Sequence, residues 1–265
     1  MKNIRDFSMF LSLCVFALAF SACSKDRSNV PTGRVMSEEY SVSGSLSKIE
    51  VSDGIRLVVS PEIPEKTVRV VTNEDAQQYV VVEQRQGALN LYVDSKSMPF
   101  SKLEVAIYVS SNNFDTFSAR TGAIISSKDT LKAGNVEVTA DGQSQIDADF
   151  DCTSMILNVN GMSVFNGSVT AEDFYAGLSA NAEVTIGGNV GYFELSTNGS
   201  SKLSGFPLSC GTMDISASGG SFTEITVTGL LQGEVSGGSK LYYKGNPPRI
   251  ILDKTGASVV ESVTE

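Results

Sequence analysis

Six turn-like segments of this sequence place a serine two residues after a glycine, the spacing found around the nucleophile of many serine hydrolases. The six segments are residues 142–144, 161–163, 199–201, 219–221, 237–239 and 256–258. None of them continues to the second glycine of the Gly-x-Ser-x-Gly motif, and the 265 residues contain no histidine to act as a general base. We therefore interpret these serines as residues of tight bends, where a hydroxyl bonds to nearby backbone.

The absence of histidine removes most familiar hydrolytic mechanisms, because no Ser-His-Asp or Cys-His relay and no carboxylate–histidine–zinc site can be assembled. The alternative enzyme class is a polysaccharide-active β-helix lyase or hydrolase that works with paired carboxylates. Such an enzyme needs Lys and Arg to handle acidic sugars, and Lys202 is the single basic residue of segment 133–239. We therefore expect no catalytic residues, no cofactor and no enzymatic activity.

Three aspartates alternate with apolar residues near the middle of the chain. The alternation places Asp147, Asp149 and Asp151 on one face of an extended strand, and Ala148 with Phe150 on the other. Calcium prefers clusters of oxygen ligands, so calcium binding is one interpretation of these carboxylates. The EF-hand glycine and the nonapeptide calcium repeat are both missing. We favour a solvated strand face and expect no metal site.

The full chain has a formal net charge of −10, and acidic side chains are concentrated in its second half. Between residues 133 and 239 twelve acids face one lysine: Glu137, Asp141, Asp147, Asp149, Asp151, Glu172, Asp173, Glu183, Glu194, Asp214, Glu224 and Glu234. A surface of this sign repels phosphate backbones and anionic headgroups. Nucleic acid is therefore excluded as a partner.

The first 22 residues have the architecture of a signal peptide. Lys2 and Arg5 form a basic start, residues 7–20 are apolar, and two small residues precede Cys23. The apolar run is shorter than the roughly 20 residues that span a bilayer, which disfavours a retained membrane anchor. The sequence Phe-Ser-Ala-Cys resembles the lipobox of bacterial lipoproteins, so we predict cleavage after residue 22 and lipid attachment at Cys23.

The segment that follows the predicted lipid site lacks hydrophobic periodicity. Residues 23–39 are rich in Ser, Pro, Asn and Gly, which predicts a flexible tether that holds the folded part off the membrane. Ser24 is not the aspartate that commonly retains lipoproteins in the inner membrane. We therefore expect an exported outer-membrane lipoprotein, facing either the periplasm or the outside.

A repeat of about 19 residues runs through the rest of the chain. Glycine, or Thr121 and Ala180 in two degenerate copies, occupies one slot in every repeat: positions 121, 142, 161, 180, 199, 219, 237 and 256. Four residues after each slot stand Ile125, Ile146, Phe165, Val184, Leu203, Thr223, Leu241 and Val260, seven of them apolar. Apolar and polar residues alternate around the slots, which is typical of strands. Each repeat is thus strand, bend, strand.

A unit of this length has no room for a crossover helix and cannot bury its apolar side alone. Stacking on its neighbours gives a continuous core and parallel strands about 4.8 Å apart. The repeat therefore predicts an all-β fold, a parallel β-helix (solenoid) with turns of about 19 residues. We expect one solenoid domain over residues 40–265, irregular over 40–115 and regular over 116–265.

Residues 49–259 resemble a bacterial family described as putative auto-transporter adhesin, head GIN domain, which is common among Bacteroidetes lipoproteins. The resemblance rests on Ile-Glu-Val-Ser-Asp-Gly-Ile at 49–55, on the recurring Gly-x-Ser bends, and on Leu-Tyr-Tyr-Lys-Gly-Asn-Pro at 241–247. It implies a right-handed β-helix without established catalytic residues. It also implies a scaffold in the cell envelope that acts as an adhesion or binding module for a glycan or an envelope or extracellular protein.

Tyrosines would have to supply any aromatic stacking on a sugar, because the chain has no tryptophan. The candidates are Tyr92, Tyr108, Tyr192, Tyr242 and Tyr243. Packing in the core or at its rim is the competing role for these rings.

Cys152 and Cys210 each lie nine residues before a glycine slot, so they share one phase of the repeat three turns apart. At about 4.8 Å per turn this separates them by roughly 14 Å, beyond the ~7 Å limit for bridged α-carbons. Ala171 and Val190 stand in the same phase between them, as in an interior stack. We therefore predict two buried, reduced thiols and no disulfide.

The lipid anchor can be tested by replacing Cys23. Cys23→Ala should abolish labelling with a fatty-acid probe and leave the precursor uncleaved, because lipoprotein signal peptidase acts on the lipidated cysteine. Metabolic labelling and mass spectrometry of the purified chain measure both effects. A variant chain that still begins at residue 23 and partitions with membranes would contradict the assignment.

Overall fold

The structure, a computed structural model, describes residues 30–111 and 114–264. The predicted signal peptide and Cys23 lie outside these residues. Strands account for 64% of the structure, and within the described ranges the only helical element is the 3-10 turn η1 (Gln77–Tyr79). None of the described elements is a helix long and apolar enough to cross a membrane.

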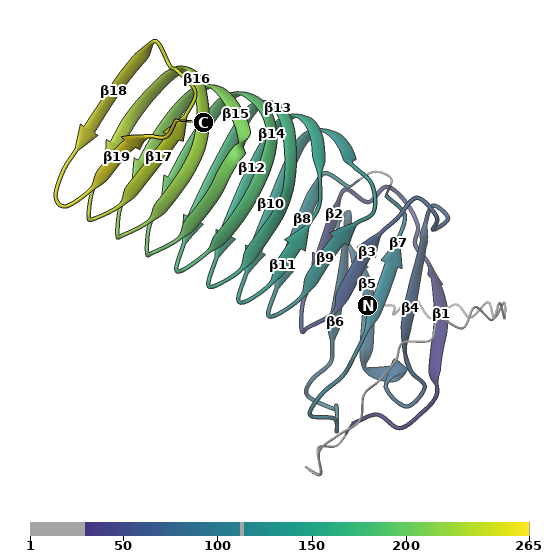
Figure 1. Ribbon diagram of the computed structural model, residues 1–265. Coiled ribbons are helices and arrows are strands. Elements are labelled where there is room, and N and C mark those ends of the chain that lie inside the picture. The colour runs from purple at the N-terminus through teal and green to yellow at the C-terminus, as the bar shows by residue number, and fades with distance from the viewer. Residues whose placement is uncertain (1–29, 112–113, 265) are drawn as a thin grey trace.

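Parallel strands stack into a β-solenoid of about 8 turns, as the repeat predicted (Figure 1). Partners lie 19 residues apart through most of the stack, so that Ile146 pairs with Phe165 and Phe165 with Val184. The strands of the regular part are β8 (Thr116–Arg120), β9 (Ile124–Ser127), β10 (Leu131–Asp141), β11 (Gln145–Asp147), β12 (Phe150–Asn160), β13 (Val164–Ser179), β14 (Glu183–Thr197), β15 (Lys202–Ala217), β16 (Phe222–Val235), β17 (Lys240–Lys244), β18 (Arg249–Lys254) and β19 (Val259–Ser262).

Each glycine slot is a tight bend in which two consecutive residues generally have positive φ. Gly142 and Gln143 have φ of 65° and 66°, and the degenerate copy at Ala180 and Asn181 has 55° and 62°. This geometry aligns the slot carbonyl with the solenoid axis. Met162 N donates to the carbonyl of Ala180 at 2.9 Å, and the same bond recurs from bend to bend. The bends therefore form a ladder of their own, and glycine serves it best because positive φ carries no Cβ penalty there.

The serines after the slots are buried inside these bends, which confirms their interpretation as bend residues. Ser144 Oγ donates to the carbonyl of Ala119 at 2.9 Å, and Ser144 N donates to Ser163 Oγ at 3.1 Å. Ser201 Oγ donates to the carbonyl of Asn198 within its own bend at 2.7 Å. These two buried serine hydroxyls therefore have partners, which removes the cost of leaving them unpaired.

The interior is built from columns of apolar side chains, one from each turn. The predicted column four residues after the slots runs from Ile125 to Leu241 and is buried. A second column includes Phe174 and Phe193, whose rings stack with centroids 4.7 Å apart. Full burial of one such ring contributes about 1.5–3 kcal/mol. The core is thus continuous along the axis.

The amino-terminal part does not follow the chain in stacking order. Its strands are β1 (Val35–Ser41), β2 (Lys48–Val51), β3 (Arg56–Val59), β4 (Thr67–Asn73), β5 (Val80–Arg85), β6 (Ala88–Val93) and β7 (Ala106–Val109). The turn made by β2 and β3 lies between the β6–β7 turn and the β8–β9 turn, and pairs in parallel with both. The chain therefore enters the solenoid at its second turn and returns to build the first.

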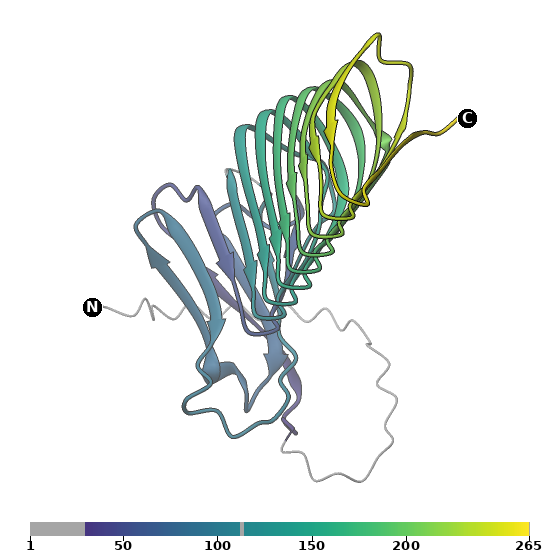
Figure 2. The same cartoon turned by 90° about the vertical axis from the view of Figure 1, so that its left-hand side faces the viewer.

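An antiparallel cap closes this end of the solenoid, as Figure 2 shows on the side away from the C-terminus. β5 pairs with β6, β4 pairs with β7, and β1 pairs with β4, all antiparallel. The 19-residue repeat, which predicts parallel strands, does not predict this antiparallel pairing. Residues 35–39, which we predicted as tether, belong to β1, because their alternating side chains match the edge of β4.

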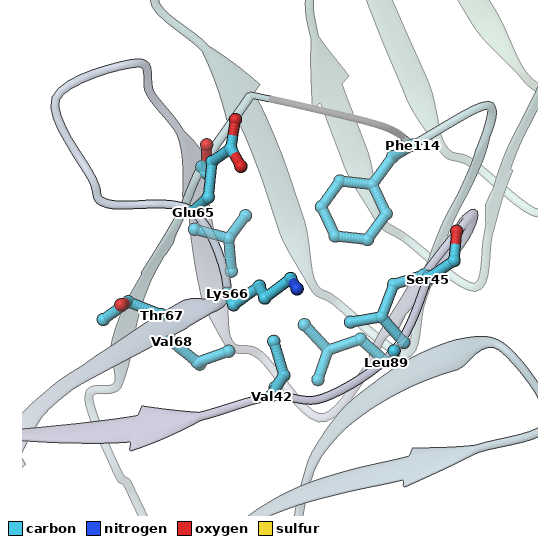
Figure 3. A pocket seen from close by; sticks show the side chains of 12 residues that line it. Val42, Ser45, Glu65, Lys66, Thr67, Val68, Leu89 and Phe114 are labelled. Atoms are coloured by element: carbon cyan, nitrogen blue, oxygen red, sulfur yellow. The ribbon is translucent and has the colours of Figure 1, made fainter.

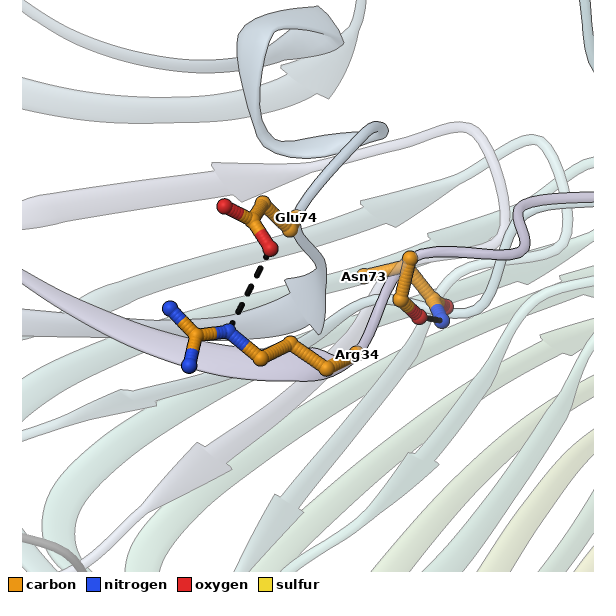
Figure 4. A network of polar contacts seen from close by, with 4 residues as sticks. Arg34, Asn73 and Glu74 are labelled. Carbon is orange, nitrogen blue, oxygen red and sulfur yellow. Dashed lines mark hydrogen bonds and ion pairs between the residues drawn. The ribbon is translucent and has the colours of Figure 1, made fainter.

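Polar contacts fasten the beginning of the described chain to the cap (Figure 4). Arg34 Nε lies 3.3 Å from Glu74 Oε2, and Asn73 Nδ2 donates to the carbonyl of Gly33 at 2.6 Å. The ion pair is exposed and contributes little by itself. The hydrogen bond from the Asn73 side chain holds Gly33 beside the end of β4.

Cys152 and Cys210 are free thiols in one column, as predicted. The column runs from Ala133 through Cys152 to Val190 and Cys210. Cys210 is fully buried, but Cys152 is only half-buried, which differs from the prediction. Its neighbours in the column, Ala133 and Ala171, are small and are also only partly buried. Burial raises the pKa of Cys152 to about 11 and that of Cys210 to about 12.

The two thiols should react at different rates with a disulfide reagent such as DTNB. The raised pKa leaves so little thiolate that Cys152 should react about 100-fold more slowly at pH 8 than an unperturbed thiol. Cys210 should react only after unfolding, because no reagent reaches it. The reaction kinetics of the variants Cys152→Ser and Cys210→Ser with DTNB show which thiol gives rise to each kinetic phase. Equal rates for the two thiols in the native protein would contradict the burial described.

The bend ladder can be tested with a matched pair of substitutions at equivalent slots. Gly237→Ala should lower the free energy of unfolding by about 2 kcal/mol, because φ is +62° and the new Cβ would lie 2.8 Å from Gly219 N. Ala180→Gly should leave stability within about 1 kcal/mol, since relief of strain is offset by unfolded-state entropy. Urea unfolding measures both, and equal losses for the two variants would refute the ladder.

Candidate functional site

The outward side chains of the carboxyl-terminal strand halves form parallel columns on one sheet of the solenoid. One column contains Ile156, Tyr175, Glu194 and Asp214, each paired with the next. Because stacked strands lie about 4.8 Å apart, each column presents side chains at a regular spacing. A neighbouring column carries Tyr192 beside Thr212.

Two tyrosines meet on this surface. Tyr175 on β13 and Tyr192 on β14 have ring centroids 6.0 Å apart at 60°, an edge-to-face contact. Tyr175 is the more open of the two, with 37% of its surface exposed. Both rings stand on central strands paired on both sides, so their positions are set by the sheet and not by a loop.

Acids and an amide border the tyrosines. Tyr192 Oη donates to Glu194 Oε2 at 3.2 Å, and Gln232 Nε2 donates to Asp214 Oδ2 at 2.9 Å. Partial burial, and then the charge of Glu194, raises the pKa of the Tyr192 hydroxyl, which stays protonated and able to donate. We call the surface made by Tyr175, Tyr192, Glu194, Asp214 and Gln232 the tyrosine–acid face.

A shallow hollow continues the tyrosine–acid face toward the C-terminal end. Its polar lining consists of Asp214, Ser216, Gln232, Glu234 and Asp253. Gly233 also borders it with φ of +125°, where a Cβ would come within 2.0 Å of the Ile215 carbonyl oxygen. Hydrogen-bond acceptors beside aromatic rings suit hydroxyl groups or cations, and the carboxylates repel anions.

The aspartates considered for calcium do point outward, as their alternation predicted, but they have separate partners. Asn166 Nδ2 donates to Asp147 Oδ1 at 2.8 Å, and Ser168 donates to Asp149. Lys132 Nζ lies 3.2 Å from Asp151 Oδ2. In the described ranges no three residues among His, Cys, Asp and Glu gather in a way that could hold a metal ion.

Of the five candidate tyrosines, Tyr192 alone lies on the tyrosine–acid face. Tyr242 is on the opposite sheet, where it packs on Phe222 with ring centroids 5.6 Å apart. Tyr175, the other ring of the pair, is not among the tyrosines expected from the sequence. Its signal was available, because Tyr175 directly precedes inward Ala176 and must therefore point outward.

A second pocket lies at the amino-terminal end, beside the cap (Figure 3). Val42, Val68, Leu89 and Phe114 give it an apolar wall, and Lys66 reaches across it. Its volume is about 60 Å³. Pockets that take small-molecule ligands usually have about 300–1,000 Å³, so this one is packing space.

Comparison with known proteins gives a family and a set of similar folds. A family model described as putative auto-transporter adhesin, head GIN domain, matches residues 45–247. No curated protein matches the sequence.

Solved structures from Parabacteroides share the fold at low sequence identity. A putative adhesin from Parabacteroides merdae is 16% identical with a TM-score of 0.76, covering 88% of this chain and 98% of its own. A putative adhesin from Parabacteroides distasonis is 20% identical with the same TM-score and coverage. A putative lipid binding protein from Parabacteroides distasonis is 16% identical with a TM-score of 0.70, again over 88% and 98%.

Proposed function

The chain belongs to the family described as putative auto-transporter adhesin, head GIN domain, and from this premise we propose that it is a non-enzymatic binding module of the cell envelope. The tyrosine–acid face is its binding surface, and a neutral or amino-bearing glycan is its ligand. The adhesin descriptions of structurally similar proteins support a surface role.

The observation that carries the proposal is the edge-to-face pair of Tyr175 and Tyr192 beside Glu194. Sugar rings offer apolar C–H faces for aromatic contact and hydroxyl groups that donate to carboxylates and amide oxygens. The acidic surroundings favour hydroxyls and amines over uronic acids or sulfated sugars, because like charges repel.

The solenoid suits this role because it holds the face in one arrangement before binding. Each strand of the face is paired on both sides, and its buried residues belong to the central columns. Little conformational entropy is then lost when a ligand binds. Repetition along the axis also matches the repetition of a polymeric ligand.

The proposal includes an outer-membrane anchor at Cys23. Residues between Cys23 and β1 would link the lipid to the capped end of the solenoid, so the regular turns would project away from the membrane. The adhesin-like role of the family supports this placement at the cell envelope. The face of the membrane to which the module is exposed follows from labelling of intact cells.

A glycan array probed with the purified protein tests the binding surface. Tyr175→Ser and Tyr192→Ser should each weaken binding about tenfold or more, since truncating an aromatic anchor of a binding surface costs about 2 kcal/mol or more. Tyr242→Ser is the matched control, because Tyr242 is also half-buried beside another ring but faces the opposite way.

Two outcomes would count against the proposal. If Tyr175→Ser and Tyr192→Ser bind the glycan as well as the wild type, the ligand does not bind at the tyrosine–acid face. Depolymerisation of any glycan by the wild type would favour the polysaccharide-active enzyme.

A further inference from the structure

The two ends of the solenoid are finished differently. At the amino-terminal end, β4 and β5 cover the outer edges of β7 and β6. At the other end, β18 pairs only with β16 and β19 only with β17. Through Thr264, no described strand pairs with the outer edges of β18 and β19, so their backbone donors and acceptors face outward (Figure 1).

The last turn also leaves part of the core uncovered. Ile250 stands in the inward column of Met213 and Leu231. Those two residues are fully buried, whereas Ile250 is 46% exposed. The difference arises because no further turn covers Ile250. Repeat proteins normally end in a turn with a polar outer face, and exposed apolar edges invite strand pairing.

The sequence of β18 is complementary to itself when two copies run antiparallel. Directly opposite residues share a sheet face, so inward residues must meet inward residues. When Ile251 lies opposite Ile251 of the other copy, inward Ile250 meets Leu252. In that same register Arg249 of each copy lies opposite Asp253 of the other copy, which gives two symmetric charge pairs. Within the described chain neither Arg249 nor Asp253 forms an ion pair.

We propose that two copies of this chain associate tail to tail through β18, in the register that places Arg249 opposite Asp253. Charge complementarity within the strand selects a second copy as the occupant. The flanks of the solenoid carry twelve acids and one lysine between residues 133 and 239, so side-by-side association is opposed by repulsion. Head-to-tail stacking is blocked because the edges of the first turn are already paired with β4 and β5.

A two-fold axis through Ile251 would make the sheet continuous across both copies and place the two caps at opposite ends. If the lipid anchor of the proposed function is present, the paired molecules could join two membranes or cells. Asp253 also lines the hollow beside the tyrosine–acid face. Tail-to-tail pairing is measured without glycan, so each proposal fails separately.

Charge reversal tests the register. Native mass spectrometry of the purified protein should show a dimer across a dilution series. Arg249→Asp and Asp253→Arg should each weaken it about tenfold or more, because each converts both cross-strand pairs to like charges. The double variant Arg249→Asp/Asp253→Arg should restore the dimer. A monomer at every concentration, or a double variant no better than the single ones, overturns the proposal.

Cross-linking tests the place of contact. Ile251→Cys should form an intermolecular disulfide under mild oxidation, since the two-fold axis brings the new cysteine against its own copy. Ile156→Cys is the matched control: Ile156 is 46% exposed and Ile251 48%, and both point outward in the same column several turns apart. Equal cross-linking through both positions would overturn tail-to-tail pairing, and so would none through Ile251→Cys.

Discussion

The in-register parallel hydrogen-bond ladder is the constraint on which the rest of this molecule depends. A ladder of this kind repeats only if every turn closes with the same geometry, and the positive-φ bends at Gly142, Gly161 and their equivalents provide that closure. Because slot carbonyls accept bonds from the preceding bend, one distorted bend disturbs two neighbours. The buried serines satisfy the polar groups that such bends would otherwise leave unpaired.

Strict register turns a one-dimensional pattern into columns with distinct tasks. Inward columns such as the one holding Phe174 and Phe193 provide the apolar burial that offsets the entropy of ordering the chain. Outward columns are free to vary, and there Tyr175, Tyr192 and the neighbouring carboxylates gather without cost to the core. Through like-charge repulsion, the same acids oppose side-by-side packing of two solenoids.

At the two ends of a solenoid, no further turn is available to cover the strand edges and the core. The amino-terminal end is closed by antiparallel strands, which can cover a parallel edge without continuing it. The last turn keeps an open edge and a partly exposed core residue, Ile250. A β-solenoid with one closed and one open end can form a closed pair but cannot grow into a fibre.

Periodicity in the sequence by itself determined the fold class, the slots, the buried serines, the outward aspartates and the separation of Cys152 from Cys210. All of these are local or repeat with one period, so neighbours along the chain predict neighbours in space. Tertiary structure alone decided the insertion of β2 and β3 between later strands, the antiparallel cap, and the half-burial of Cys152. It also left Ile250 exposed, because position in the stack depends on pairings between distant segments that no local pattern encodes.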